Sequence, residues 1–220
     1  MRRVIMSYIE VKQCSKTIKG KIILDNINLQ LEKGKIYGFV GKNGSGKTML
    51  FRSICGLIKP SEGSISINGE VLHKDISFPR NVGVIIESPG FWDELTGYEN
   101  LELLSKIKGL IGEKEIRHAI ERVGLKHDDS RIYKKYSLGM KQRLAVAQAI
   151  MESPDLLILD EPTNGLDEEG IDQIRKIILE ENQRGSTVLI ASHNKEDISI
   201  LAEKIYRVID GKLTDEVKKP

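Results

Sequence analysis

The sequence has few cysteines and no long apolar run, and each absence narrows what the chain can be. Cys14 and Cys55 are its two cysteines, far apart and outside any metal-ligand or redox spacing. This excludes a disulfide scaffold and is typical of a reducing compartment. No apolar stretch approaches the roughly 18 residues of a membrane-spanning helix. Residues 1–3 are basic, but the apolar core of a signal peptide does not follow, so we expect a cytoplasmic chain.

A strong charge of one sign is also missing. The formal net charge is +2 over 220 residues, and the Lys218-Lys219 tail is too short to add a basic patch. We therefore expect no nucleic-acid partner. With 40% hydrophobic and 30% charged residues, the composition is that of an ordinary soluble globular protein. The length suits a single domain spanning residues 1–220.

What the sequence does have is a glycine-rich stretch, GKNGSGKT at residues 41–48, which we call the phosphate loop. It matches the phosphate-binding pattern G-x-x-x-x-G-K-[ST]. An apolar segment at 35–40 precedes it and predicts a buried strand. Apolar residues at helical spacing follow it, from Met49 to Leu57. The strand–loop–helix context favours a phosphate site over a chance glycine-rich turn.

The residue types of the phosphate loop explain its expected chemistry. Glycines let the backbone approach a phosphate closely, and the freed N–H groups bind its oxygens at a helix N-terminus. The Lys47 ammonium is expected to contact the β- and γ-phosphates, and the Thr48 hydroxyl is expected to be a ligand of a Mg²⁺ ion. The predicted phosphate-binding residues are Gly41, Lys42, Asn43, Gly44, Ser45, Gly46, Lys47, Thr48 and Met49.

The hydrophobic patterns predict two kinds of sheet. Short alternating segments near the N-terminus predict a small, mostly antiparallel sheet. Its expected strands are 8–14, 22–24, 27–31 and 64–68. Continuous apolar runs separated by helical patterns predict a parallel sheet with helices on both faces, hence an α/β fold. The expected strands of this second sheet are 35–40, 82–86, 156–159, 187–191 and 205–210.

A helical insertion is expected from about residue 88 to residue 152. Thr96 and Glu99 have the spacing of a capping box. The first helix should bury a stripe of Leu101, Leu104 and Ile107, and Gly109 should end it. The other two helices are marked by apolar positions from 116 to 123 and by residues 140–151.

Polar residues follow three of the predicted parallel strands, at the strand ends where ligands of such sheets bind. They are Glu87, the pair Asp160-Glu161, and His193. Asp160 ends an apolar run, and Mg²⁺ held jointly with Thr48 would offset the cost of burying its carboxylate. Glu161 is expected to deprotonate or orient a water. His193 could contact the γ-phosphate. The alternatives are an acidic turn stiffened by Pro162 and a purely structural histidine.

The stretch YSLGMKQR at 136–143 is a further candidate anion site. Ser137 and the N–H groups around Gly139 stand where a helix is expected to begin. The alternative is an ordinary Ser-Gly helix start.

Together these stretches resemble the ATP-binding subunit of ABC transporters over nearly the whole chain. The matching stretches are the Walker A loop at 41–48, the signature SLGM at 137–140, Walker B at 156–162, the D-loop NGLD at 164–167 and the switch histidine His193. The resemblance implies a P-loop NTPase fold, Mg²⁺-dependent ATP hydrolysis and a separate transmembrane permease. It also implies a head-to-tail dimer that clamps ATP with Ser137, Gly139, Met140 and Asp167 of the opposite copy.

Three departures from the family pattern stand out. Where the family usually has a metal-binding Gln, this chain has Glu87, in IIESPGFWDELTGYENL. The same glutamate is found in exporters for bacitracin resistance and lantibiotic immunity, which suggests peptide-antibiotic export. No aromatic lies between Cys14 and Leu24, where the alignment places adenine stacking near Ile18. In the signature, Leu138 and Met140 replace a Gly and a Gln, so Ser137 and Gly139 should carry the anion clamp.

Two other functions share the phosphate loop. A non-transport ABC ATPase of translation or DNA repair usually has two such domains or long coiled coils, for which 220 residues leave no room. A small-molecule kinase would not need the signature or the histidine at a strand end. The expected function is therefore that of a transport ATPase.

Overall fold

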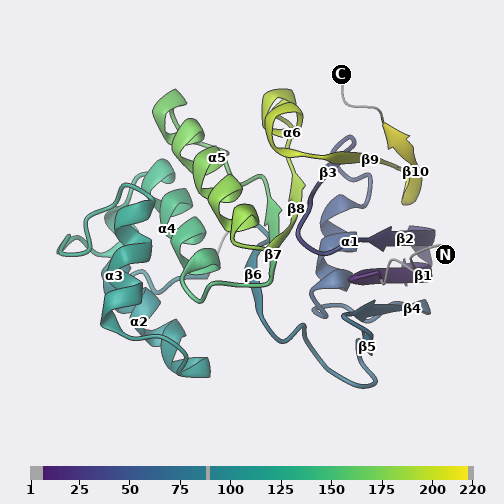
Figure 1. Ribbon diagram of the computed structural model, residues 1–220, viewed down its shortest axis with the longest axis horizontal. Helices are drawn as coiled ribbons and strands as arrows, with labels where there is room; N and C mark the ends of the chain where they lie inside the picture. The colour runs from purple at the N-terminus through teal and green to yellow at the C-terminus, as the bar shows by residue number, and fades with distance from the viewer. Residues whose placement is uncertain (1–6, 88–89, 218–220) are drawn as a thin grey trace.

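The computed structural model describes residues 7–87 and 90–217, which form two sheets with helices around them (Figure 1). The basic N-terminal residues 1–3, the Lys218-Lys219 pair and Ser88, where we expected the helical insertion to begin, lie outside the described residues. Within these ranges, no helix has the length and apolar character needed to span a bilayer.

The smaller sheet is antiparallel, as predicted, with the strand order β2-β1-β4-β5. Its strands are β1 (Ile9–Ile18), β2 (Lys21–Leu31), β4 (Glu62–Ile67) and β5 (Glu70–Val71). The prediction of two separate strands at 22–24 and 27–31 was wrong. Asn26 has a φ of 49°, but β1 pairs with β2 on both sides of it, so the polar pair Asp25-Asn26 forms an irregularity within one strand.

The larger sheet has the order β10-β9-β3-β8-β7-β6. Its strands are β3 (Ile36–Val40), β6 (Val82–Ile85), β7 (Leu156–Asp160), β8 (Thr187–Ala191), β9 (Lys204–Ile209) and β10 (Lys212–Val217). All neighbours are parallel except β9 and β10, which form a hairpin. Strand β10 was not predicted from the sequence, so the sheet has an antiparallel edge beyond the expected strands.

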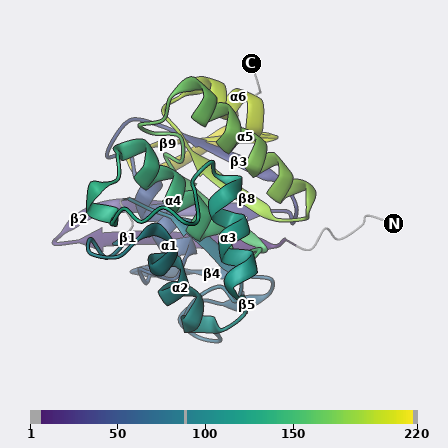
Figure 2. The same ribbon diagram turned by 90° about the vertical axis from the view of Figure 1, so that its left-hand side faces the viewer.

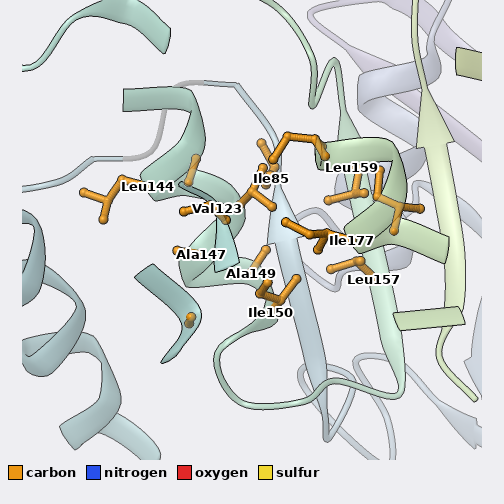
Figure 3. Close-up of a cluster of buried hydrophobic side chains, with 14 of the residues drawn as sticks. Ile85, Val123, Leu144, Ala147, Ala149, Ile150, Leu157, Leu159 and Ile177 are labelled. Carbon is orange, nitrogen blue, oxygen red and sulfur yellow. The ribbon is translucent and has the colours of Figure 1, made fainter. Parts of the chain in front are cut away.

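Both faces of the larger sheet are covered, as the continuous apolar runs indicated. In β7, Leu157 and Leu159 point into one buried cluster, whereas Leu156 and Ile158 point into the other. Helix α1 (Lys47–Ile54) lies on the side of the antiparallel sheet, and α4 (Leu138–Ile150), α5 (Glu168–Gln183) and α6 (Lys195–Leu201) lie on the opposite side (Figure 1). Figure 3 shows side chains of α4 and α5 meeting those of β6 and β7.

The remaining helices, α2 (Gly97–Lys108) and α3 (Glu113–Arg122), lie at the end of the molecule away from the antiparallel sheet (Figure 1). Figure 2 turns this end toward the viewer. A short 3-10 turn at Tyr133–Lys135 precedes α4. The capping box at the start of α2 is present, with both reciprocal hydrogen bonds between Thr96 and Glu99. The predicted stripe of α2 was partly wrong. Leu101 is fully buried, but Ile107 is 77% exposed, although Ser105 in the same last turn of α2 is buried.

Candidate functional site

The phosphate loop connects β3 to α1, and its first glycine, Gly41, stands where a side chain would collide. A Cβ on Gly41 would lie 2.3 Å from the carbonyl oxygen of Val208. Gly46 has a φ of 112° at the N-cap of α1, a conformation that residues with a side chain rarely adopt. The first turn of α1 has neither a side-chain cap nor an acidic residue. Its backbone N–H groups are therefore available to an anion.

Lys47 places its ammonium group inside this loop. Its Nζ donates hydrogen bonds to the carbonyl oxygens of Gly41, at 2.7 Å, and Lys42, at 3.3 Å. The residue is 6% exposed, so the loop wraps around a positive charge shielded from solvent. A buried cation beside free N–H groups is the arrangement that favours a phosphate chain.

A hydroxyl–carboxylate pair joins the loop to the end of β7. The Thr48 hydroxyl donates to Oδ2 of Asp160 at 2.6 Å, although the two residues are 112 positions apart. Both groups offer the hard oxygen ligands that Mg²⁺ prefers, and Mg²⁺ in nucleotide sites takes one or two such groups together with phosphates. The residues present therefore fit the predicted ion.

Glu161 lies next to this pair with its backbone in the left-handed region, at a φ of 54°. Burial raises the pKa of its carboxyl group above the ordinary value, although a hydrogen bond from the His193 backbone opposes this. That bond joins His193 N–H to Oε2 at 3.1 Å. Oε1 lies 3.5 Å from His193 Nε2 and accepts no hydrogen bond from the part of the chain that is described. A basic, partly buried oxygen is thus left to accept a proton.

Glu87 has an unexpected partner. Its carboxylate forms a 2.7 Å ion pair with Arg52 of α1, and the Glu87 side chain is 62% exposed. Glu87 nonetheless lines the same cavity as Thr48, Asp160 and Glu161, a space of about 520 Å³. The negative charge that Glu87 brings in place of a neutral Gln is therefore balanced by the Arg52 guanidinium.

The cavity brings most of the predicted residues together. Its lining includes residues 43–49 of the loop, Glu87, Asp160, Glu161 and His193. The signature residues do not reach it. Ser137 instead caps α4 by accepting the Met140 N–H at 3.2 Å, and Asp167 caps α5 with its side chain 78% exposed. Gly139 is likewise outside the described lining of this cavity.

Two further features of the site, besides the Arg52–Glu87 pair, were not predicted from the sequence. Lys21 and Ile23 of β2 line the cavity beside the loop, whereas Ile18, where we expected the adenine, does not. No local sequence motif identifies Lys21 and Ile23 as residues of the site. Gln142 donates from its side-chain amide to the backbone oxygens of Glu161 and Pro162, at 3.1 and 2.9 Å. Its place within the signature stretch was the one available clue.

Comparison with known proteins decides the family. A family model described as "ABC transporter" matches residues 24–164. The chain belongs to the ABC transporter family. As the motifs indicated, it is an ATP-binding subunit with ATPase activity and a P-loop α/β fold, and the translation, repair and kinase alternatives are not favoured.

Individual relatives agree with this assignment. The chain is 51% identical over 210 residues to an uncharacterized ABC transporter ATP-binding protein, YybJ, of Bacillus subtilis (strain 168), covering 96% of each. It is 42% identical to the bacitracin transport ATP-binding protein BcrA of Enterococcus faecalis, covering 97% of this chain and 70% of BcrA. A solved ATP-binding subunit of an ABC transporter superposes with a TM-score of 0.86 at 27% identity, covering 96% of this chain and 90% of that one.

Proposed function

We propose that this ABC subunit powers export of a peptide antibiotic, or of a similar amphiphile, through a separate transmembrane permease. Through that permease it would lie at the inner face of the cell membrane. The likeness to the bacitracin transport protein supports the cargo class. Glu87, which stands where the family usually has a Gln and is part of the resemblance to these exporters, agrees with the same cargo class. We propose residues 1–220 as one domain, with the helical insertion at about 88–152.

The observation that carries the mechanism is the grouping of Thr48, Asp160 and Glu161 around the phosphate loop. Thr48 and Asp160 would hold Mg²⁺, with Glu87 within the same cavity as a third oxygen ligand. When bound, the ion would neutralise charge on the β- and γ-phosphates. The Lys47 ammonium and the loop N–H groups bind and orient the phosphates.

Glu161 acts as the base in this proposal. Its raised pKa and its unpartnered Oε1 suit a group that takes a proton from a water. His193 lies beside it, and its side chain is 51% exposed at the cavity. From there its ring would hydrogen-bond the γ-phosphate and fix the direction of attack.

A second copy of the chain completes the site. Ser137, Gly139, Met140 and Asp167 lie outside the cavity of their own chain, and the neighbouring Leu138 is 67% exposed. In a head-to-tail dimer, the N-terminus of α4 in one copy would face the phosphates held by the other.

The cargo and the permease can be tested together. A bacitracin-sensitive strain would express the chain with the membrane protein that co-purifies with it, and resistance would be measured as growth. We expect resistance with the wild type and none with Lys47→Ala, which removes the phosphate-binding ammonium. Co-purification with ribosomes or DNA instead of a multi-span membrane protein would contradict the transport role.

A further inference from the structure

Asp197, on α6, is a fully buried carboxylate that the mechanism above does not use. Its Oδ2 accepts hydrogen bonds from the hydroxyl groups of Thr163, at 2.6 Å, and Ser192, at 2.9 Å. Its Oδ1 accepts one from Nε of Arg175, at 2.8 Å. A buried charge is stable only when paired and hydrogen-bonded, and here three donors on three separate segments meet that need.

The two hydroxyl donors flank the catalytic pair. Thr163 follows Glu161 by two residues, and Ser192 directly precedes His193. Glu161 and His193 themselves touch through the 3.1 Å bond from the His193 backbone N–H to the Glu161 carboxylate. One carboxylate oxygen therefore bridges the two loops that carry the contact.

The other carboxylate oxygen fixes this bridge to α5. The Arg175 side chain is 10% exposed, and its remaining nitrogens lie 3.3 Å from Asp172 and 3.4 Å from Glu196. Both of those acids are largely exposed, so the solvent-side pairs contribute little. The Arg175–Asp197 pair is the strong link because it is buried, where solvent and salt do not screen it.

We propose that Asp197 is a positioning residue that sets the spacing of Glu161 and His193 through Thr163 and Ser192. Asp197 does not line the cavity that the phosphate loop forms with Asp160 and Glu161. This inference rests on the catalytic roles proposed above for Glu161 and His193. Losing either hydroxyl would let one loop shift relative to the other, and a displacement of about 1 Å at a catalytic group costs up to about a hundredfold in rate.

The test compares variants that keep the buried carboxylate, since Asp197→Ala leaves Arg175 unpaired and endangers folding. Thr163→Val keeps the shape of Thr163 but removes its hydroxyl, and Thr163→Ser restores the hydroxyl. Ser192→Ala removes the second hydroxyl. Glu196→Gln is the matched control, because it alters an exposed partner of the same arginine. For each purified full-length variant, we would measure kcat and KM for ATP hydrolysis, and the melting temperature.

We expect Thr163→Val and Ser192→Ala each to lower kcat by about tenfold with KM changed by less than about twofold. Thr163→Ser should recover most of the lost rate, and Glu196→Gln should match the wild type. Wild-type kcat in both hydroxyl-deleted variants would overturn the proposal, as would a loss that Thr163→Ser fails to restore. Glu161→Gln, measured alongside, tests the proposed base separately, since its hydrolysis should vanish whatever the role of Asp197.

Discussion

The hydroxyl of Thr48 donates a 2.6 Å hydrogen bond to the carboxylate of Asp160, and this joins α1 to the end of β7. The strand that leads into α1 is β3, which is not a neighbour of β7, because β8 lies between them in the sheet. The two side chains therefore meet across the carboxyl edge of β8. This hydrogen bond places the phosphate loop next to Asp160 and Glu161, the residues proposed to bind the metal and the attacking water.

Removing the Thr48 hydroxyl should weaken metal binding more than nucleotide binding. If Thr48 holds the ion as proposed, Thr48→Val would remove one Mg²⁺ ligand and the hydroxyl donor to Asp160, so apparent Mg²⁺ affinity should fall by about tenfold. ATP affinity without Mg²⁺ should stay near wild type. Titrating Mg²⁺ against ATPase rate measures the effect, and Thr48→Ser, which keeps the hydroxyl, is the control. Equal Mg²⁺ titrations for Thr48→Val and wild type would remove Thr48 from the metal site.

Glu87→Gln should alter the Mg²⁺ dependence of hydrolysis more than ATP affinity. The Arg52–Glu87 pair is partly exposed, so its loss should change stability by less than about 1 kcal/mol. Glu70→Gln is a suitable control because it breaks a similar pair, with Arg80, outside the cavity. An unchanged Mg²⁺ titration in Glu87→Gln would show that this carboxylate serves Arg52 rather than the metal.

The pH dependence of hydrolysis should follow Glu161. Burial raises the pKa of this carboxyl group, and a base acts only when deprotonated. The rate should therefore be lost as pH falls through the raised pKa, at a midpoint above the value of about 4.3 for a free glutamate. Profiles of kcat against pH measure this, with ATP affinity followed over the same range. An acid limb at or below the free-glutamate value would contradict the assignment.

Gly83 of β6 should be among the least replaceable residues of the core. A Cβ there would lie 1.9 Å from the carbonyl oxygen of Ala149 in α4. Gly83→Ala must push α4 away from the sheet, so it should destabilise the fold by about 1–3 kcal/mol. Gly90→Ala, where a Cβ meets nothing within 4 Å, should stay within about 0.5 kcal/mol. Denaturant midpoints compare the two, and equal midpoints would refute the close approach.

Sequence patterns were sufficient where the signal is local. The phosphate loop, the apolar strand before Asp160 and the capping box at Thr96 each depend on residues a few positions apart, and the structure has all three. The predicted break between strands at Asn26 was wrong. Its polar neighbourhood is typical of a turn, but pairing with β1 overrides that local preference.

The features that were not predicted depend on distant contacts. The Arg52–Glu87 pair joins residues on separate elements. Asp197 has the local appearance of an ordinary acid near a helix N-terminus, and its burial becomes evident only once α5 packs against α6. The signature residues were recognised, but a single chain does not bring them to its own phosphate loop.

Two copies of this chain are expected to close over ATP, after which Glu161 starts its hydrolysis. The most direct measurement mixes the Glu161→Gln variant with Mg-ATP, follows its mass by sedimentation, and assays the nucleotide retained after gel filtration. We predict a dimer that keeps one unhydrolysed ATP per chain. A monomer that retains no nucleotide, or a variant that still turns over ATP at the wild-type rate, would contradict this mechanism.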